Sequence, residues 1–366
     1  MGNNRNDSIT RTSIVGIVSN LMLSAFKLIV GLVSNSVAVV LDAVNNISDA
    51  LSSAITIVGV RLAGRKPDRK HPFGYGRIEY FSAIIISAII FAAGVSSLVE
   101  SVKAIFHPEI TEFTLVSLSV IAVALVGKLI LGRYFVKQGE KLNSDALVAS
   151  GTEASYDAIL SGSTIFCAVA SMIWGVSIDG FVGLIISAFI IKTGIEMLLD
   201  PLGKVVGNRL QGELSQTIKQ RIKEVPGVNG VYDLVLHDYG PEKAIGSVHV
   251  EVSDTLTPSE IQIVTRSVAA LVYSEFKAVV TVGIYVSNDR DPGILKMKKL
   301  ISDIVLPHDG VKQMHGFFTD GDNIVFDIVV AFDHDADAIC RSIESEITKI
   351  YPDKLLNIVV DTDYSD

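Results

Sequence analysis

The stretch LDAVNNISDA, residues 41–50, places polar side chains within an apolar segment that is long enough to cross a bilayer. Asn45 and Asp49 stand four residues apart, so on a helix their oxygens point the same way, one turn apart. Glu153 and Asp157 repeat this spacing in GTEASYDAIL, again beside a long apolar run. An ionisable side chain at membrane depth costs about 2.5 to 3.5 kcal/mol on insertion scales. The two pairs therefore predict one cation site shared by two helices, with hydrogen bonding between helices as the alternative.

The composition is typical of a membrane protein that also has a soluble part. Of the 366 residues, 49% are hydrophobic and the mean hydropathy is +0.45. The length leaves room for two or three domains, and the apolar residues come in blocks of about 20, the length of a membrane span. The two cysteines, Cys167 and Cys340, are too few for a disulfide framework. The polar start and the long first apolar run argue against a cleavable signal peptide.

Charge and hydropathy predict six spans with a fixed orientation. Lys and Arg gather between the second and third spans, after the fourth and after the sixth, which by the positive-inside rule places both termini and the tail in the cytoplasm. The net charge is −9, and residues 291–366 carry fifteen acidic against seven basic side chains. This sign argues against a nucleic-acid partner. The expected spans are residues 14–33, 37–60, 80–106, 113–135, 146–174 and 181–199.

After residue 208 the pattern changes to short amphipathic elements in the order helix, strand, strand, helix, strand, and this order recurs after a break at residues 288–293. We therefore predict an α-helical membrane domain with six transmembrane helices, plus an α/β tail of two tandem αββαβ units of the ferredoxin-like or metallochaperone-like type. The expected boundaries are 1–12 for an N-terminal cytoplasmic tail, 13–207 for the transport domain, and 208–289 and 290–366 for the two tail units.

Five motifs in this order resemble the cation diffusion facilitator family over residues 14–287. They are NNISD at 45–49, EASYD at 153–157, HPFGYGR at 71–77, LHDYGP at 236–241 and SVHVEV at 247–252. The resemblance implies a homodimeric antiporter of divalent cations and protons in the cell (inner or plasma) membrane, with a metal-binding cytoplasmic domain and no cofactor. The second αββαβ unit lies beyond the usual pattern. No P-loop, nucleophile elbow or HExxH motif points to an enzyme.

Carried over from the family, the transport site consists of Asn45, Asp49, Glu153 and Asp157. Members that transport zinc usually have a histidine in such a set, whereas this set offers only oxygen. Oxygen ligands suit manganese better than zinc, so Mn²⁺ is the first choice of substrate, with Zn²⁺, Fe²⁺, Co²⁺ or Cd²⁺ as alternatives. A non-transporting metal sensor or scaffold that acts through the tail is the competing class of function.

Two further sets of residues are candidate metal ligands. Asp68 and His71 fall where some members of the family carry a loop site, but Tyr75 replaces a further histidine, and a simple turn is the alternative. In the first tail unit the candidates are His237, Asp238, His249 and Glu251. His249 and Glu251 share one face of a strand, and a solvated sheet face is the alternative interpretation. Tyr232 and Tyr285 replace two zinc-type ligands there.

Other charged residues have simpler explanations. The run of acidic residues at 333–337 is interpreted as the N-cap of a helix, with metal ligation as the alternative. Charged residues in or near the spans are interpreted as snorkelling side chains or interhelical pairs. These are Lys27, Glu100, Lys128, Lys192 and Glu196.

Overall fold

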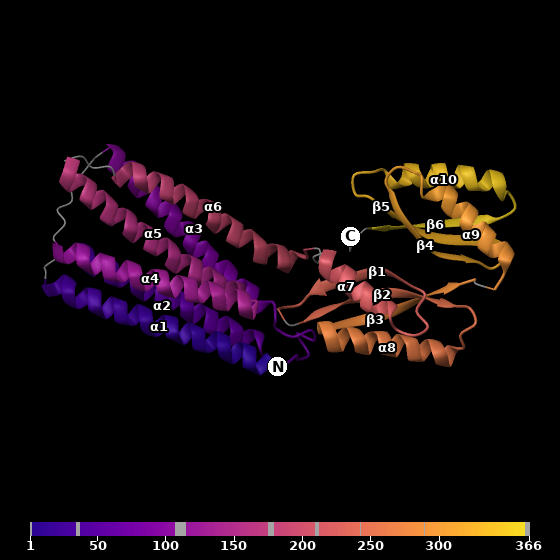
Figure 1. Ribbon diagram of the computed structural model, residues 1–366, viewed down its shortest axis with the longest axis horizontal. Helices are drawn as coiled ribbons and strands as arrows, with labels where there is room; N and C mark the ends of the chain where they lie inside the picture. The colour runs from indigo at the N-terminus through magenta and orange to yellow at the C-terminus, as the bar shows by residue number, and fades with distance from the viewer. Residues whose placement is uncertain are drawn as a thin grey trace. The chain divides into compact units, whose positions relative to one another are not determined.

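The computed structural model describes residues 2–33, 37–106, 115–174, 179–208, 212–241, 243–288 and 290–362. The chain divides into two compact units, of which the first holds residues 1–208 with 239–242 and the second holds the remainder. Long helices form the first unit, and two small sheets with their helices form the second (Figure 1). The predicted architecture, a helical membrane domain followed by two αββαβ units, is confirmed.

The membrane domain consists of long helices that pack in pairs. Each has 27 to 32 residues, and at about 1.5 Å per residue this exceeds the roughly 30 Å of a hydrocarbon core. Helix α1 packs against α2, α3 against α6, and α4 against α5. The helices are α1 (Gly2–Val33), α2 (Val37–Ala63), α3 (Ile78–Phe106), α4 (Leu115–Leu142), α5 (Asp145–Trp174) and α6 (Asp179–Val206).

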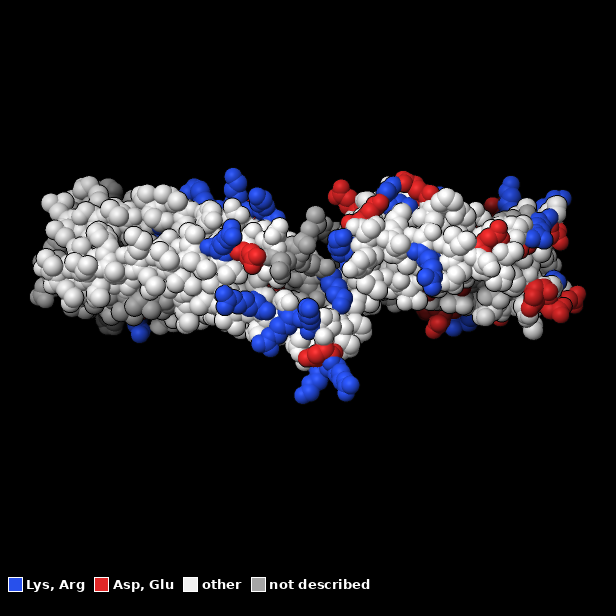
Figure 2. Space-filling model, turned by 90° about the horizontal axis from the view of Figure 1, so that it is seen from below, with Lys and Arg blue, Asp and Glu red and all other residues white. Residues whose placement is uncertain are grey.

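Four of these helices are apolar enough to cross a membrane by length and composition, counting only the described residues. These stretches are Asn4–Val30, Ile78–Phe106, Leu118–Leu142 and Gly180–Val206. The other two helices, α2 and α5, have similar length; several side chains of α2 lie outside the described residues, and α5 carries Glu153 and Asp157. On the face seen in Figure 2, a broad uncharged surface covers the helices, and Lys and Arg gather toward one end.

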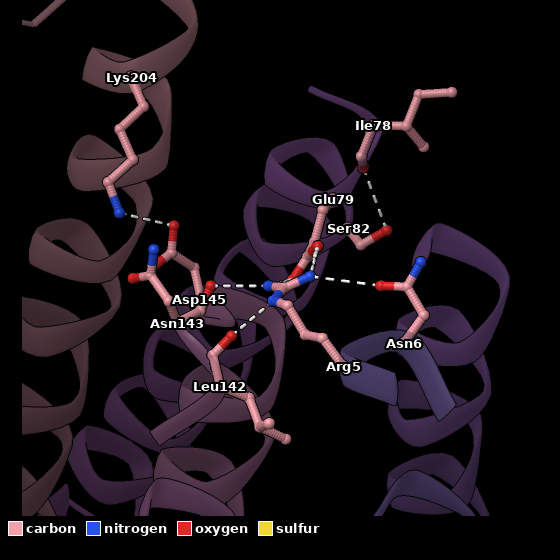
Figure 3. A network of polar contacts seen from close by, with 9 residues as sticks. All are labelled: Arg5, Asn6, Ile78, Glu79, Ser82, Leu142, Asn143, Asp145 and Lys204. Carbon is pink, nitrogen blue, oxygen red and sulfur yellow. Dashed lines mark hydrogen bonds and ion pairs between the residues drawn. The ribbon is translucent and has the colours of Figure 1, made fainter. Parts of the chain in front are cut away.

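Helix α1 begins at Gly2, although residues 1–12 were expected to form a polar tail. Figure 3 shows the reason: the guanidinium of Arg5 lies at a meeting point of helix ends and binds Glu79 of α3 with both of its terminal nitrogens, at 2.8 and 3.0 Å. It also donates to the carbonyl oxygens of Leu142 and Asn143, between α4 and α5. Lys204 of α6 pairs with Asp145 of α5 nearby, at 2.7 Å. These polar contacts fold the first turns of α1 onto the bundle.

The tail contains two three-stranded sheets with the same topology. In each, the first two strands are antiparallel and the last two are parallel. The first unit comprises α7 (Gly212–Lys223), β1 (Gly230–Asp238), β2 (Ala244–Ser253), α8 (Pro258–Phe276) and β3 (Ala278–Ser287). The second comprises α9 (Pro292–Val305), β4 (Val311–Thr319), β5 (Asn323–Val330), α10 (Ala336–Ile350) and β6 (Leu355–Thr362).

Each tail unit has its own apolar core between one face of its sheet and its two helices. Val248, Val250 and Val252 alternate along β2 and are fully buried against α7 and α8. The start of α8 is fixed by a capping box, in which Thr257 and Glu260 satisfy each other's backbone N–H groups. Because the helices cover one face of each sheet, the other face is left for polar side chains.

We predict that Arg5→Ala destabilises the membrane domain strongly, because it leaves Glu79, whose side chain is 2% exposed, as a buried charge without its partner. Breaking a buried pair in this way costs about 3 to 5 kcal/mol. The measurement is the midpoint of unfolding of the detergent-solubilised protein in an SDS titration. Arg11→Ala, at an exposed position on the same helix, should leave the midpoint within error. Equal midpoints for the two variants would contradict this role of Arg5.

Candidate functional site

The two pairs of residues predicted to form the transport site lie on the facing helices α2 and α5. Asp49 of α2 is buried, with a relative exposure of 8%. The hydroxyl of Ser52, one turn further along α2, donates to Glu153 of α5 at 3.0 Å. Asp157 lies one turn from Glu153 on the same helix. The backbone of Asn45 is in α2, but its side chain lies outside the described residues. The structure therefore brings together three of the four predicted ligands.

A lysine from a third helix completes this site. Lys128 of α4 has a side chain that is only 3% exposed, and its ammonium group donates to a carboxylate oxygen of Asp49 and, at 2.6 Å, to one of Asp157. One fixed positive charge thus lies between the two carboxylates that were expected to hold a metal ion. Charge pairing of this kind offsets the cost of placing carboxylates at membrane depth. The carboxylates predicted to bind a metal ion thus already hold a tethered cation.

Close packing of α4 on α5 places Lys128 in this position. Gly132 lies one turn after Lys128, and a Cβ atom there would be 2.5 Å from the hydroxyl of Ser155 and 3.0 Å from the carbonyl oxygen of Gly151. Any larger residue at position 132 would separate the helices. The glycine therefore allows the short distance across which Lys128 reaches Asp157.

Lys128 is the functional residue whose role the sequence analysis missed. Interhelical pairing was one of the two roles expected for the lysines in the spans, but its partners were not foreseen as the transport ligands themselves. A signal was present, because a lysine in the middle of an apolar run faces protein partners far more often than lipid. Lys27 of α1 behaves similarly: it is buried and donates to Asn46 at 3.4 Å. In contrast, Lys192 and Glu196 form an exposed pair along α6.

The loop candidates Asp68 and His71 form a turn. One oxygen of Asp68 accepts hydrogen bonds from the backbone N–H groups of Lys70 and His71, at 2.9 and 2.7 Å. The other accepts the hydroxyl of Tyr75 at 2.7 Å, and this bond is the main reason that the pKa of Asp68 lies below its ordinary value. The ring of His71 lies against that of Tyr75 at a tilt of 38°. Both carboxylate oxygens are thus used within the loop, which favours the structural interpretation.

The four tail candidates do not come together. His237 is exposed and pairs in register with Ile245, four residues along β2 from His249, which corresponds to about 13 Å. Glu251 accepts the hydroxyl of Tyr232 at 2.9 Å and pairs with Lys298 at 3.2 Å. Asp238 is at the end of the same strand as His237.

His249 instead binds a residue that the sequence analysis did not single out. Its Nδ1 lies 2.9 Å from a carboxylate oxygen of Asp233, and this hydrogen bond raises the pKa of His249 above its ordinary value.

The acidic run at 333–337 caps a helix, which agrees with its interpretation from the sequence: Asp335 accepts the N–H of Ala338 at the start of α10. Asp333 pairs with His334 beside it.

Comparison with known proteins identifies the chain. The family model described as the cation efflux transmembrane domain matches residues 13–203, which is more than half of the chain. The model described as the cytoplasmic domain of cation efflux proteins matches residues 210–286. The chain belongs to the cation efflux, or cation diffusion facilitator, family. It is therefore a multi-pass membrane transporter of metal cations and not an enzyme.

Several relatives cover most of the transporter. An uncharacterised transporter of Methanocaldococcus jannaschii is 28% identical over 69% of this chain and 89% of its own length. The manganese efflux system protein MneS of Bacillus subtilis is 28% identical over 66% of this chain and 81% of its own length. MneP, a second manganese efflux system protein of that organism, is 24% identical over 78% and 98%. The second tail unit lies outside both matched family models.

We predict that Lys128→Gln increases the affinity of the transporter for Mn²⁺, because it removes a cation that competes for Asp49 and Asp157. The expected gain is roughly tenfold or more, equivalent to about 1.4 kcal/mol of relieved competition. Equilibrium dialysis of the detergent-solubilised protein against Mn²⁺ measures it. Lys192→Gln removes an exposed lysine of α6 and should change nothing. Weaker Mn²⁺ binding by the Lys128 variant than by the parent would refute competition.

Proposed function

We propose that the transporter exports divalent cations in exchange for protons, with Mn²⁺ as its principal substrate and Asn45, Asp49, Glu153 and Asp157 as its ligands. The observation that carries this proposal is the convergence of Asp49 and Asp157 on one buried cation, the ammonium of Lys128. Two helices that hold a cation at one point can exchange it for another. Metal cation transport by the family, and relatives named as manganese efflux proteins, support the same substrate class.

The ligand types favour manganese over zinc. The three described ligands are carboxylates, and the fourth, Asn45, adds an amide oxygen. Hard oxygen ligands suit Mn²⁺, whereas zinc sites in proteins usually include nitrogen or sulfur. The buried polar groups beside the quartet, Ser52 and Lys128, add no imidazole or thiolate.

Charge balance gives a reason for exchange with protons. When a divalent cation enters, repulsion between the two cations would displace Lys128 from at least one of the two carboxylates. When the metal leaves, Lys128 returns but supplies only one positive charge. Protons on the remaining carboxylates, with Glu153 foremost, would restore the balance in a site of low dielectric constant. The three carboxylates then titrate as one coupled group.

Topology and assembly follow from charge distribution and family. Lys and Arg between α2 and α3, after α4 and after α6 support an orientation with both termini and the tail in the cytoplasm. We infer that the transporter is a homodimer of the cell (inner or plasma) membrane, supported by its match to the cytoplasmic domain of cation efflux proteins. In this orientation the site would load metal from the cytoplasm.

Asp49→Ala and Asp157→Ala should each reduce Mn²⁺ flux to the level of protein-free liposomes. Each removes a charged ligand, and a divalent cation cannot lose its water for fewer oxygens without a large cost. The assay is Mn²⁺ uptake into proteoliposomes under an imposed pH gradient, after size-exclusion chromatography has shown that each variant is folded. Glu196→Gln, at an exposed acidic position on α6, serves as the control with parental flux. Full flux in either aspartate variant would exclude that residue from the site.

Glu153→Gln should leave part of the metal flux but weaken its dependence on pH. The amide keeps an oxygen ligand and the contact with Ser52, yet it can no longer bind and release a proton. Flux is measured at a fixed internal pH while the external pH is varied. A variant whose flux follows the gradient as steeply as that of the parent would show that Glu153 takes no part in proton exchange.

A further inference from the structure

The two tail units contact each other through polar side chains on the sheet faces that their helices leave uncovered. Helices α7 and α8 cover one face of the first sheet, and α9 and α10 cover one face of the second (Figure 1). On the uncovered faces, the ring of Tyr232 stacks on that of His315, with centroids 4.8 Å apart and planes within 8°. Tyr285 meets the same imidazole edge-on. His315 is thus enclosed by both units.

Three carboxylates surround this imidazole. Nε2 of His315 lies 2.9 Å from Asp233, 3.3 Å from Asp361 and 3.9 Å from Asp327. One potential ligand atom from each of the four residues lies within 4.8 Å of every other. Asp233 belongs to β1 of the first unit, whereas the other three belong to β4, β5 and β6 of the second. The cluster therefore needs both units.

His315 provides a second, independent sign of a missing ligand. Its side chain is 0% exposed, and neither ring nitrogen forms a hydrogen bond with any described residue. The nearby oxygen of Asp233 lies close to Nε2 but without hydrogen-bond alignment. A buried polar side chain without a hydrogen bond is unusual, because its desolvation is not compensated. Here the imidazole faces three carboxylate oxygens.

The charges around the cluster are also unbalanced. Within the described parts of the chain, ion pairs of Asp233, Asp327 and Asp361 involve only the imidazoles of His249 and His315. Neither Lys nor Arg provides a permanent positive charge there. Partly buried carboxylates held this close repel one another unless a cation joins them. A divalent ion would supply that charge and would also occupy the free nitrogen.

The second unit has ligand-type residues at positions where the first unit has tyrosines. In each unit the first strand has a bulge with a left-handed residue, Asp233 (φ 50°) in β1 and Gly316 (φ 61°) in β4. The preceding residues, Tyr232 and His315, are therefore equivalent.

The strand partners extend this match. Tyr232 pairs with His249, and His315 pairs with Asp327. On the third strand of the first unit, Tyr285 lies two residues after Gly283, the partner of His249. On the third strand of the second unit, Asp361 lies two residues after Val359, the partner of Asp327. Tyr285 and Asp361 are therefore equivalent. Where the first unit has tyrosine hydroxyls, the second has an imidazole and a carboxylate.

The first unit supports the cluster instead of duplicating it. The hydroxyl of Tyr285 donates to Asp233 and to Asp327, which holds these two carboxylates toward the same point. His249 contacts the same oxygen of Asp233 as Tyr285 does, and the other oxygen of Asp233 faces His315. A Cβ at Gly316 would lie 3.0 Å from the carboxylate of Asp327, so glycine leaves that side open. Such outer contacts orient ligands in metal sites.

We propose that Asp233, His315, Asp327 and Asp361 bind one divalent transition-metal cation that joins the two tail units. Three carboxylate oxygens with one imidazole nitrogen suit Mn²⁺, Fe²⁺, Co²⁺ or Zn²⁺. The proposal rests on the geometry of the tail and not on the transport site. The site differs from the predicted tail quartet, of which only His249 contacts it, through Asp233.

The test uses the full-length protein in detergent, with affinity tags removed, and Mn²⁺ as the probe. Bound Mn²⁺ is counted by mass spectrometry after equilibrium dialysis, and pulsed EPR detects nitrogen coupled to the bound ion. His315→Ala should lower the stoichiometry by about one ion per chain and abolish the imidazole coupling. His334→Ala, in the same unit but outside the cluster, should leave both unchanged.

Two further variants keep the result decisive. Asp361→Asn preserves the shape of the side chain and should lower the affinity of the tail site for Mn²⁺ by roughly tenfold or more. This variant tests the site if His315→Ala fails to fold. Asp49→Ala should remove a different ion, one without nitrogen coupling. If the proposed transport site is wrong, the result for the tail site therefore still stands. Parental stoichiometry in both His315→Ala and Asp361→Asn, or no nitrogen coupling in the parent, would overturn the proposal.

Discussion

The membrane domain depends on the paired contacts of Lys128 with Asp49 and Asp157. These contacts join α2, α4 and α5 at one buried point. Each of the three charges alone would be costly at membrane depth, and together they are tolerable. The same arrangement explains how a site for a divalent cation can persist when no metal is bound. A tethered ammonium takes the place of the ion and holds the carboxylates in position.

Much of the architecture could be predicted from the sequence because its signals are local. Blocks of apolar residues give the helices, and alternation in the tail gives strands whose order repeats. The spacing of four residues between Asn45 and Asp49, and between Glu153 and Asp157, places each pair on one face of its helix, and helix geometry alone predicts this. The full extent of α1 could not be predicted for the opposite reason: residues 1–12 are polar, and only the pairing of Arg5 with Glu79, far apart in sequence, shows why the helix begins at Gly2.

The rest could not be predicted because it depends on which elements become neighbours. Lys128 stands alone in α4, and nothing in its spacing identifies Asp49 as its partner. The cluster around His315 combines strands from both repeats, and its formation requires the bulges in β1 and β4. A bulge shifts every later side chain in its strand, so faces assigned by simple alternation fail there. This explains why simple alternation along β1 did not identify Asp233 as the partner of His249.

The two centres differ in chemistry in a way that fits separate tasks. The proposed transport ligands are all oxygen and lie beside a competing charge, the ammonium of Lys128, which favours release of the ion. The cluster in the tail adds an imidazole and has no such competitor among the described residues, which favours retention. A transporter that holds one ion firmly in its tail while it exchanges another in its membrane domain would couple tail assembly to metal supply.

The central claim is that the transported metal and the ammonium of Lys128 occupy the same place. The most direct measurement is an experimental structure of the protein with Mn²⁺, in which anomalous scattering at the manganese edge locates the ion. The account predicts a peak between Asp49 and Asp157, with the ammonium of Lys128 withdrawn from at least one of these carboxylates. A membrane domain in which Lys128 still bridges both carboxylates while manganese binds elsewhere among the helices would contradict it.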